Sequence, residues 1–247
     1  MGVCMLEKNI KFTPQSDFVE LSEDPPVPSY TKIPDWFKSI KPEIKMSKDE
    51  MLEATGCPSR YSGTVKKCVP VLDSFTSGYL ICLPQDLEIK KVDDHHFVFW
   101  PMDRPTSKFM TYEEPYRLSS FIIPKDHDPY PWRVNTGYSI QTPKGYSTLI
   151  THPFNRFDLP FQTMTGIIDT DGLVLDNVVT LFFHKDFEGI IEKGTPIAQL
   201  LPFKRDNWKS SKEKAPTAAQ YYTNFFEIRS KVTRFYHNHI WTKKQYR

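Results

Sequence analysis

Two aspartates separated by one residue carry the clearest chemical signal in the sequence. Asp169 and Asp171 stand in GIIDTDG (166–172), a stretch that is otherwise apolar apart from Thr170 and has glycine at both ends. A carboxylate at such a place can accept a proton from a water that attacks a phosphate, provided that the water lies within hydrogen-bond reach. The same residues also suit a tight turn, in which aspartate forms the corner and glycine adopts a positive φ. In both interpretations, strands on either side of the two aspartates must hold them in place.

A second polar turn, HPFNRFD (152–158), follows a β-rich run. Asn155, Arg156 and Asp158 could contact a phosphate or a base. Alternatively, Arg156 and Asp158 could form an ion pair that only fixes the loop. The residues alone leave these two alternatives open.

Histidine and cysteine do not form a recognisable metal-binding pattern. In a strand, His95 and His96 would point to opposite faces, so both could bind one ion only across a bulge. No further ligands stand at the spacing of a zinc or iron site, which favours surface or hydrogen-bonded histidines and no metal. The seven histidines are His95, His96, His127, His152, His184, His237 and His239. Cys4, Cys57, Cys68 and Cys82 show no ligand spacing, so we expect free thiols.

The elements that must position these residues are strands. Between Val69 and Phe203 the chain is strand-like, and prolines, glycines and Asp/Asn interrupt its short apolar runs at the intervals typical of an all-β sandwich or barrel. The runs are GYLICL, HHFVFW, SSFIIP, GYSIQTP, YSTLITHP, VVTLFFH, GIIEKG and PIAQLLPF. We therefore predict an all-β fold.

The two ends differ from this β-rich region. SKDEMLEATG (47–56) has a serine cap, early acidic residues and a closing glycine, which predicts a short helix. Trp36 and Phe37 are expected to dock on the main body, protected from solvent. Near the C-terminus, apolar residues at steps of three or four predict an amphipathic helix. They are Tyr221, Phe225, Ile228, Val232 and Phe235.

Composition and charge narrow the class of protein. The 247 residues suit one large domain with appendages, and no apolar run is long enough to span a membrane. The first residues lack the pattern of a signal peptide, so a reducing compartment is expected. Residues 204–247 contain 11 Lys/Arg against 3 Asp/Glu, whereas the preceding residues contain 21 against 27. This basic tail suits nucleic acid, but a solvated face or a contact with the protein's own acidic body is favoured.

Four segments in order resemble the dUTPase and dCTP deaminase superfamily, and their gaps are close to those of the family. The segments are TSGYLICLPQDLEI (76–89), TGYSIQTPKGYSTLITHPFNR (136–156), TGIIDTDG (165–172) and IEKGTPIAQLLPF (191–203). The resemblance implies a dUTPase-like β-clip, a distorted jelly roll, that forms homotrimers. It also implies that Asp169 occupies the place of the general base, that Asp171 braces the turn, and that Asn155, Arg156, Asp171 and Gln199 are candidate ligand-binding residues.

Several residues depart from the family pattern. Leu80 stands where the family has a metal-associated aspartate, and an apolar side chain cannot hold the waters of a Mg²⁺ ion. Phe154 and Asn155, with Arg156 displaced, stand where the family has an arginine and two serines. Gly172 replaces a tyrosine that packs under the sugar, and Pro196 replaces an arginine. Losing these groups removes much of the electrostatic stabilisation that phosphate chemistry needs. Ordinary dUTP hydrolysis is therefore not expected.

The whole chain also resembles proteins of unassigned activity that are widespread in tailed bacteriophages, which implies a source but no activity. We expect an N-terminal extension over 1–68, a dUTPase-like β domain over 69–203, and a basic segment with a helix over 204–247. The favoured function is binding without catalysis, in the virion or its assembly or with a host protein in the host cytoplasm. The alternative is a divergent nucleotide-binding protein or nucleotide pyrophosphatase centred on Asp169, with Mg²⁺ required only then. Nucleic-acid binding through the basic tail is a third hypothesis, and no membrane partner is expected.

Overall fold

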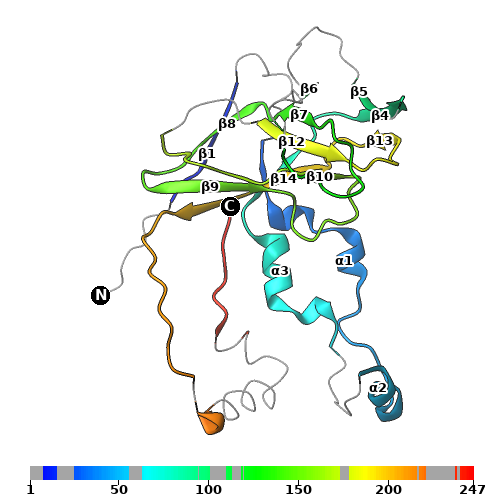
Figure 1. Ribbon diagram of the computed structural model, residues 1–247. Helices are drawn as coiled ribbons and strands as arrows, with labels where there is room; N and C mark the ends of the chain where they lie inside the picture. The colour runs from blue at the N-terminus through cyan, green and yellow to red at the C-terminus, as the bar shows by residue number, and fades with distance from the viewer. Residues whose placement is uncertain are drawn as a thin grey trace. The chain divides into compact units, whose positions relative to one another are not determined.

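The computed structural model of the chain is mostly β-sheet, with a few short helices (Figure 1). The described residues are 8–15, 25–55, 63–93, 95–100, 110–112, 118, 120–172, 178–215, 217–220, 237 and 240–247. They belong to two compact units. The first, termed the β unit, comprises Met1–Lys32, Gly78–Arg205 and Tyr246, and the second comprises Ile33–Ser77, Asp206–Gln245 and Arg247.

Within the described residues, the strands of the β unit form four antiparallel sheets. Their orders are β11-β9-β14-β3-β2, β10-β12-β7-β6, β13-β4-β5 and β1-β8. The strands are β1 (Lys11–Pro14), β2 (Val27–Pro28), β3 (Tyr79–Cys82), β4 (Leu87–Val92), β5 (His95–Phe99), β6 (Met110–Tyr112), β7 (Trp132–Asn135), β8 (Tyr138–Gln141), β9 (Tyr146–Thr151), β10 (Phe161–Thr163), β11 (Gly166–Ile168), β12 (Val178–Phe183), β13 (Gly189–Ile191) and β14 (Pro196–Lys204). The 3-10 helix η2 (Ser29–Lys32) follows β2.

One hydrophobic core is shared by all four sheets of the β unit. Leu200 of β14 and Leu181 of β12 are fully buried, and Ile89 of β4 is 1% exposed. Apolar and polar residues alternate along β4, as expected when a strand packs one face on a core and leaves the other in solvent. β4 is therefore a half-buried strand, although its sequence is not among the apolar runs that predicted strands.

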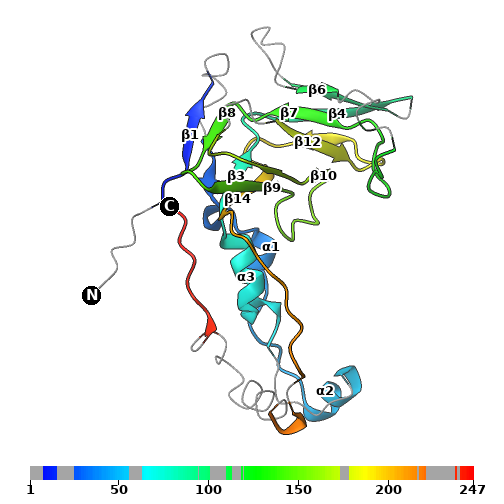
Figure 2. The same ribbon diagram turned by 60° about the vertical axis from the view of Figure 1, so that its left-hand side comes forward.

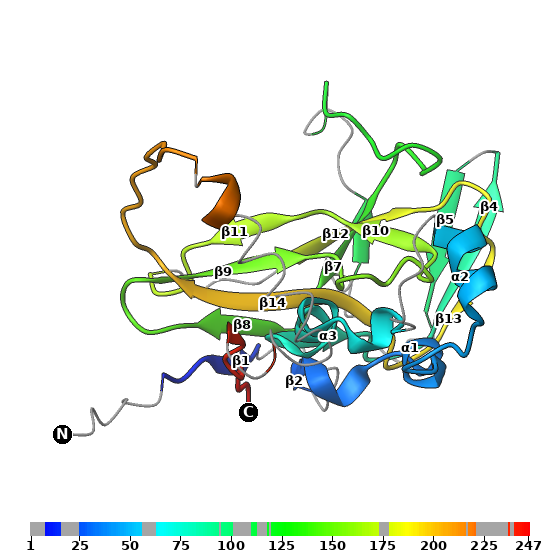
Figure 3. The ribbon, with the colours of Figure 1, turned by 90° about the horizontal axis from the view of Figure 1, so that it is seen from below.

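The four family-like segments come together in the five-stranded sheet. β9 lies between β11 and β14 (Figure 3). On its other edge β14 pairs with β3. Each of these strands comes from a different one of the four segments, although the segments are spread over more than a hundred residues. The register places Ile168, the last residue of β11, opposite Thr148, and Thr148 opposite Pro202. The residues after β11 therefore emerge beside the start of β9 and the end of β14.

The second unit is helical. Its elements are α1 (Asp35–Ser39), α2 (Lys48–Thr55), the 3-10 helix η3 (Val65–Lys67) and α3 (Val69–Thr76). α1 and α3 lie side by side in two views, and the rings of Phe37 and Phe75 are 4.6 Å apart at their centroids (Figures 1 and 2). At the start of α2, Ser47 Oγ accepts from the Glu50 amide while the Glu50 carboxylate accepts from the Ser47 amide. This reciprocal cap confirms the predicted helix.

Three expectations about local structure need correction. Val69–Thr76 is helix rather than strand, since Pro70 lies in its first turn, where a missing amide hydrogen costs nothing. The described part of SSFIIP forms no strand, and Ile122 is 90% exposed there. Trp36 is 43% exposed although Phe37 is buried, because neighbouring positions of a helix face different sides.

The C-terminal residues of the second unit contact an acidic side chain of α3. The indole Nε1 of Trp241 donates to Asp73 at 2.9 Å, and Lys244 Nζ lies 2.6 Å from the same carboxylate. Part of the basic tail thus contacts an acidic residue of the protein itself, which is one of the two alternatives that the sequence analysis favoured. The predicted amphipathic helix over Tyr221–Phe235 lies outside the described residues. No helix within the described residues is long and apolar enough to cross a membrane.

Candidate functional site

Asp169 and Asp171 occupy the turn that follows β11, at the edge of the five-stranded sheet. The Gly172 amide donates to the Asp169 carbonyl at 3.2 Å, which closes the turn. Because β11 pairs with β9 in antiparallel register, this turn lies beside the residues that begin β9. The aspartates thus stand in a turn, as predicted, but the expected positive φ is found at neither Gly166 nor Gly172.

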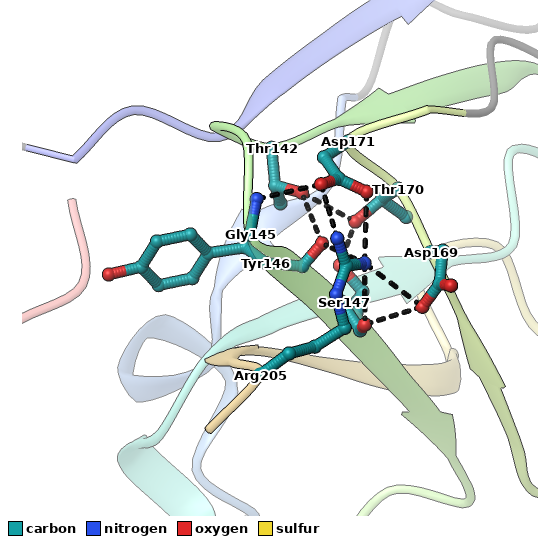
Figure 4. A network of polar contacts seen from close by, with 9 residues as sticks. Thr142, Gly145, Tyr146, Ser147, Asp169, Thr170, Asp171 and Arg205 are labelled. Carbon is teal, nitrogen blue, oxygen red and sulfur yellow. Dashed lines mark hydrogen bonds and ion pairs between the residues drawn. The ribbon is translucent and has the colours of Figure 1, made fainter. Parts of the chain in front are cut away.

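A single cation, Arg205, joins both aspartates (Figure 4). Its Nη1 atom donates to Asp171 Oδ1 at 2.9 Å and lies 3.1 Å from Asp169 Oδ1, while its Nη2 donates to Asp171 Oδ2. Nη1 also donates to the Tyr146 carbonyl and to Ser147 Oγ, both at 3.2 Å. Arg205 follows directly after β14, so strand pairing places its guanidinium across the start of β9. The family resemblance and residue spacing gave no indication of this arginine.

Asp169 is an exposed carboxylate, and one of its two oxygens has hydrogen-bond and ion-pair partners. Its Oδ1 atom accepts from Ser147 Oγ at 2.6 Å and faces Arg205, and its side chain remains 70% exposed. The Ser147 hydrogen bond, followed by the Arg205 charge, holds the pKa of Asp169 below its usual value. A lowered pKa makes a carboxylate a weaker proton acceptor. The other oxygen, Oδ2, has no partner among the described residues.

Asp171 braces the turn, as the resemblance implied. Its Oδ2 accepts from the Gly145 amide at 2.7 Å, and its side chain is 10% exposed. The Arg205 hydrogen bonds, followed by the Gly145 amide, lower the pKa of Asp171 to about 2. Behind it, a buried chain of hydroxyls runs from Thr142 through Thr170 to Thr148, with oxygens 2.7 and 2.9 Å apart. Asp171 and the threonine hydroxyls therefore hold the turn in place.

The low pKa of Asp171 predicts an acid-sensitive β unit. A carboxylate whose folded pKa is depressed contributes stability that is present above its unfolded pKa and is lost as the pH falls through the folded value. We therefore expect the Asp171 contribution to disappear between about pH 4 and about pH 2. Urea unfolding of Asp171→Asn should show a smaller acid-induced loss of stability than the wild type. Asp93→Asn, at a turn outside the network, should retain the full loss, and identical acid dependence in all three proteins would contradict this role.

The polar turn 152–158 is held by internal contacts. Arg156 Nε donates to Asp158 Oδ1 at 2.8 Å and Nη2 to Oδ2 at 2.9 Å, so of the two alternatives the structure contains the loop-fixing ion pair. His152 bonds the Arg156 carbonyl through Nε2 and accepts from the Thr163 amide through Nδ1, and burial lowers its pKa. Gln199 is 2% exposed, and its Oε1 accepts from the Phe154 amide at 2.9 Å. The side-chain amide of Gln199 therefore helps to fix the loop 152–158.

The candidate ligand residues form two groups rather than one. Gln199 pairs with Thr151, the last residue of β9, whereas Asp169 bonds Ser147 near the start of that strand. Four residues of strand separate these ends by roughly 13 Å. Asp169 and Asp171 are thus together, and Asn155, Arg156 and Gln199 lie at the other end of β9. Asn155 adopts a φ of 57°, a conformation that asparagine tolerates better than most residues.

The histidines serve packing in the part of the chain that is described. His96 is buried in β5, and its Nδ1 lies 2.6 Å from Asp128 Oδ2, while its neighbour His95 is partly exposed. This alternation confirms that the two rings face opposite sides. Among the described residues, no group of three or more His, Cys, Asp or Glu could hold a metal ion. Cys68 and Cys82 are free thiols.

Among known proteins, the chain has distant similarity to solved structures. No family model matches the chain, and no curated protein matches it either. Among solved structures, the chain is similar to a mutant dUTPase of Staphylococcus bacteriophage 80alpha, solved with dUpNHpp. The identity is 15% and the TM-score 0.27, over 53% of this chain and 90% of the dUTPase chain. A similarity of this size assigns no activity. The chain is a mostly β-sheet protein whose acidic pair is bound to its own arginine.

Proposed function

We propose that this protein is a non-catalytic binding protein of a tailed bacteriophage, built on a dUTPase-like β-clip. Support for the scaffold comes from the four family-like segments, whose strands lie next to one another in a single sheet. The binding role is either in the virion and its assembly or with a host protein in the host cytoplasm. The absence of catalysis is the part of the proposal that the site geometry supports best.

The observation that carries the proposal is the contact of Arg205 with both aspartates. An ionised carboxylate that already accepts from Ser147 and faces a guanidinium gains little by taking a proton from water, because protonation would weaken both interactions. Arg205 also donates hydrogen bonds to Asp171, to the Tyr146 carbonyl and to Ser147. The residue at the place of the general base is thus an acceptor within a turn.

The surroundings of the acidic pair agree with this role. Leu80, at the place of a metal-associated aspartate, is 5% exposed and packed in β3, where it offers no ligand for Mg²⁺. Gln199 is bonded to the loop after β9 and is buried. A phosphate-binding site here would therefore lack a carboxylate ligand for Mg²⁺ and would also lack the side chain of Gln199.

Nucleotide binding is a second candidate, favoured by the exposed Oδ2 of Asp169. A pyrophosphatase needs a carboxylate oxygen open to water, and this one is. Since the polar turn 152–158 lies at the far end of β9, such a site would need that turn from another copy of the chain, which fits the homotrimer that the resemblance implies. Sedimentation of a monomer at working concentrations would contradict this second function.

The test of the proposal is hydrolysis of nucleoside triphosphates by the purified wild-type chain with Mg²⁺. We expect no product above a protein-free control for any common ribo- or deoxyribonucleotide. A saturable turnover of even one nucleotide would overturn the non-catalytic assignment. Thermal-shift measurements with the same nucleotides separate the second candidate, because a ligand that binds only the folded state raises the melting temperature.

A further inference from the structure

A tryptophan surrounded by lysines stands on an exposed, irregular segment directly after the β unit. Residues 206–215 contain neither helix nor strand, and all of them are exposed (Figure 2). Trp208 is 89% exposed, although an indole of this size is ordinarily buried to a large extent. No other apolar side chain larger than alanine occurs between Asp206 and Ala215. The segment therefore has no apolar face with which to fold back on the protein.

The lysines of this segment are not neutralised by any of the described residues. Lys209, Lys212 and Lys214 make no ion pair with any carboxylate in the described part of the chain. Glu213, the acid between two of them, accepts a hydrogen bond from Ser211 Oγ at 3.2 Å. The nearby Arg205, in contrast, is committed to Asp169 and Asp171. Three solvated cations thus follow a single exposed indole within six residues.

We propose that residues 206–215 bind single-stranded nucleic acid, with a base stacked on Trp208 and phosphates on Lys209, Lys212 and Lys214. Base stacking on an aromatic side chain beside a basic track is how proteins bind single strands without reading their sequence. An irregular, exposed segment can follow such a strand, and its lysines release counterions from the phosphates.

Two other partners fit the segment less well. Anionic membranes are bound by helices with a broad apolar face, and one indole without apolar neighbours provides none. An acidic protein would account for the lysines but leaves the flat face of Trp208 without a matching surface. A nucleobase matches both features, because every base offers a π-face next to a phosphate.

The experiment is fluorescence anisotropy of a labelled oligothymidylate titrated with the full chain. We expect the logarithm of affinity to fall with the logarithm of salt concentration with a slope of about −2, as three phosphate contacts on a single strand require. Trp208→Ala should weaken binding by about 5- to 150-fold, the range for loss of one stacked base. Phe157→Ala, which removes another exposed aromatic at 88% exposure, should leave binding unchanged.

The second part of the experiment tests the lysines by removing their charge. The triple change Lys209→Gln, Lys212→Gln and Lys214→Gln should abolish most of the salt dependence. Its matched control, also in the second unit, removes three exposed lysines elsewhere, namely Lys41→Gln, Lys45→Gln and Lys48→Gln. We expect that control to retain the affinity and slope of the wild type.

The outcomes separate the proposal from its competitors. No binding by the wild type at low salt would overturn it, as would equal losses in the two triple variants, which would mean non-specific charge attraction. Full affinity of Trp208→Ala would overturn the stacking contact. Binding to phosphatidylserine vesicles but not to the oligonucleotide would assign the segment to membranes instead.

Discussion

Gly78→Ala is expected to lower the free energy of unfolding by roughly 3 kcal/mol or more, because two costs add at this residue. Gly78 has a φ of +74°, and this left-handed conformation costs a residue with a side chain about 1–2 kcal/mol. An added Cβ would also lie 2.0 Å from the Leu200 carbonyl oxygen. That oxygen belongs to the backbone of β14, so relief would require β14 to move away from β3.

Urea denaturation checks this prediction, with Gly166→Ala as its control. Gly166 lies in β11 of the same sheet, and a Cβ added there meets nothing within 4 Å. The control should unfold close to the wild-type midpoint, whereas Gly78→Ala should unfold far below it or fail to fold. Equal midpoints for the two variants would contradict the close approach of β3 and β14.

Asp128→Ala is the second large effect, with an expected loss of about 3 kcal/mol or more for breaking a buried hydrogen-bond network. Both side chains of the His96–Asp128 pair are at most 1% exposed. Asp128 also accepts from the backbone amides of His96 and Tyr130, at 3.0 and 2.8 Å. Its removal takes away the acceptor of all these contacts, of which the two to His96 are buried, and a buried polar group that loses its partner is costly.

A surface pair provides the matched control for this prediction. Asp126 lies two residues before Asp128 and pairs with Lys185, but both side chains are about half exposed. Because Asp126 has a φ of 62°, the control is Asp126→Asn, which removes the charge and keeps a side chain that tolerates this conformation. Asp126→Asn should therefore leave the unfolding midpoint close to that of the wild type. If Asp128→Ala unfolded no earlier than Asp126→Asn, the buried pair would not be an organising contact of the fold.

Local patterns in the sequence predicted most of the strands and the helix that is capped. The opposite facing of His95 and His96 follows from the two-residue period of a strand. The Ser47–Glu50 cap is likewise local. The helix Val69–Thr76 was missed because its short apolar run has the length of a buried strand, a case that periodicity alone does not resolve.

The candidate site was only partly predictable, because its decisive contact is between residues far apart in sequence. Asp169 and Asp171 stood out by spacing and resemblance. Arg205 did not, since it appears in sequence as one member of a basic run, and only the pairing of β14 with β9 brings it to the aspartates. The burial of Gln199 also depends on this pairing. Strand register, which sequence alone does not reveal here, therefore decides what the acidic pair can do.

The central claim, that Asp169 is a structural acceptor rather than a general base, is tested most directly by comparing turnover in two isosteric variants. Asp169→Asn keeps the shape of the side chain but cannot take a proton, and Asp171→Asn weakens the turn. Nucleotide turnover should be measured for both variants and the wild type at matched folded fraction. We predict equal, background-level turnover in all three. Turnover by the wild type that is lost in Asp169→Asn, but only reduced with stability in Asp171→Asn, would contradict the claim and identify Asp169 as the base.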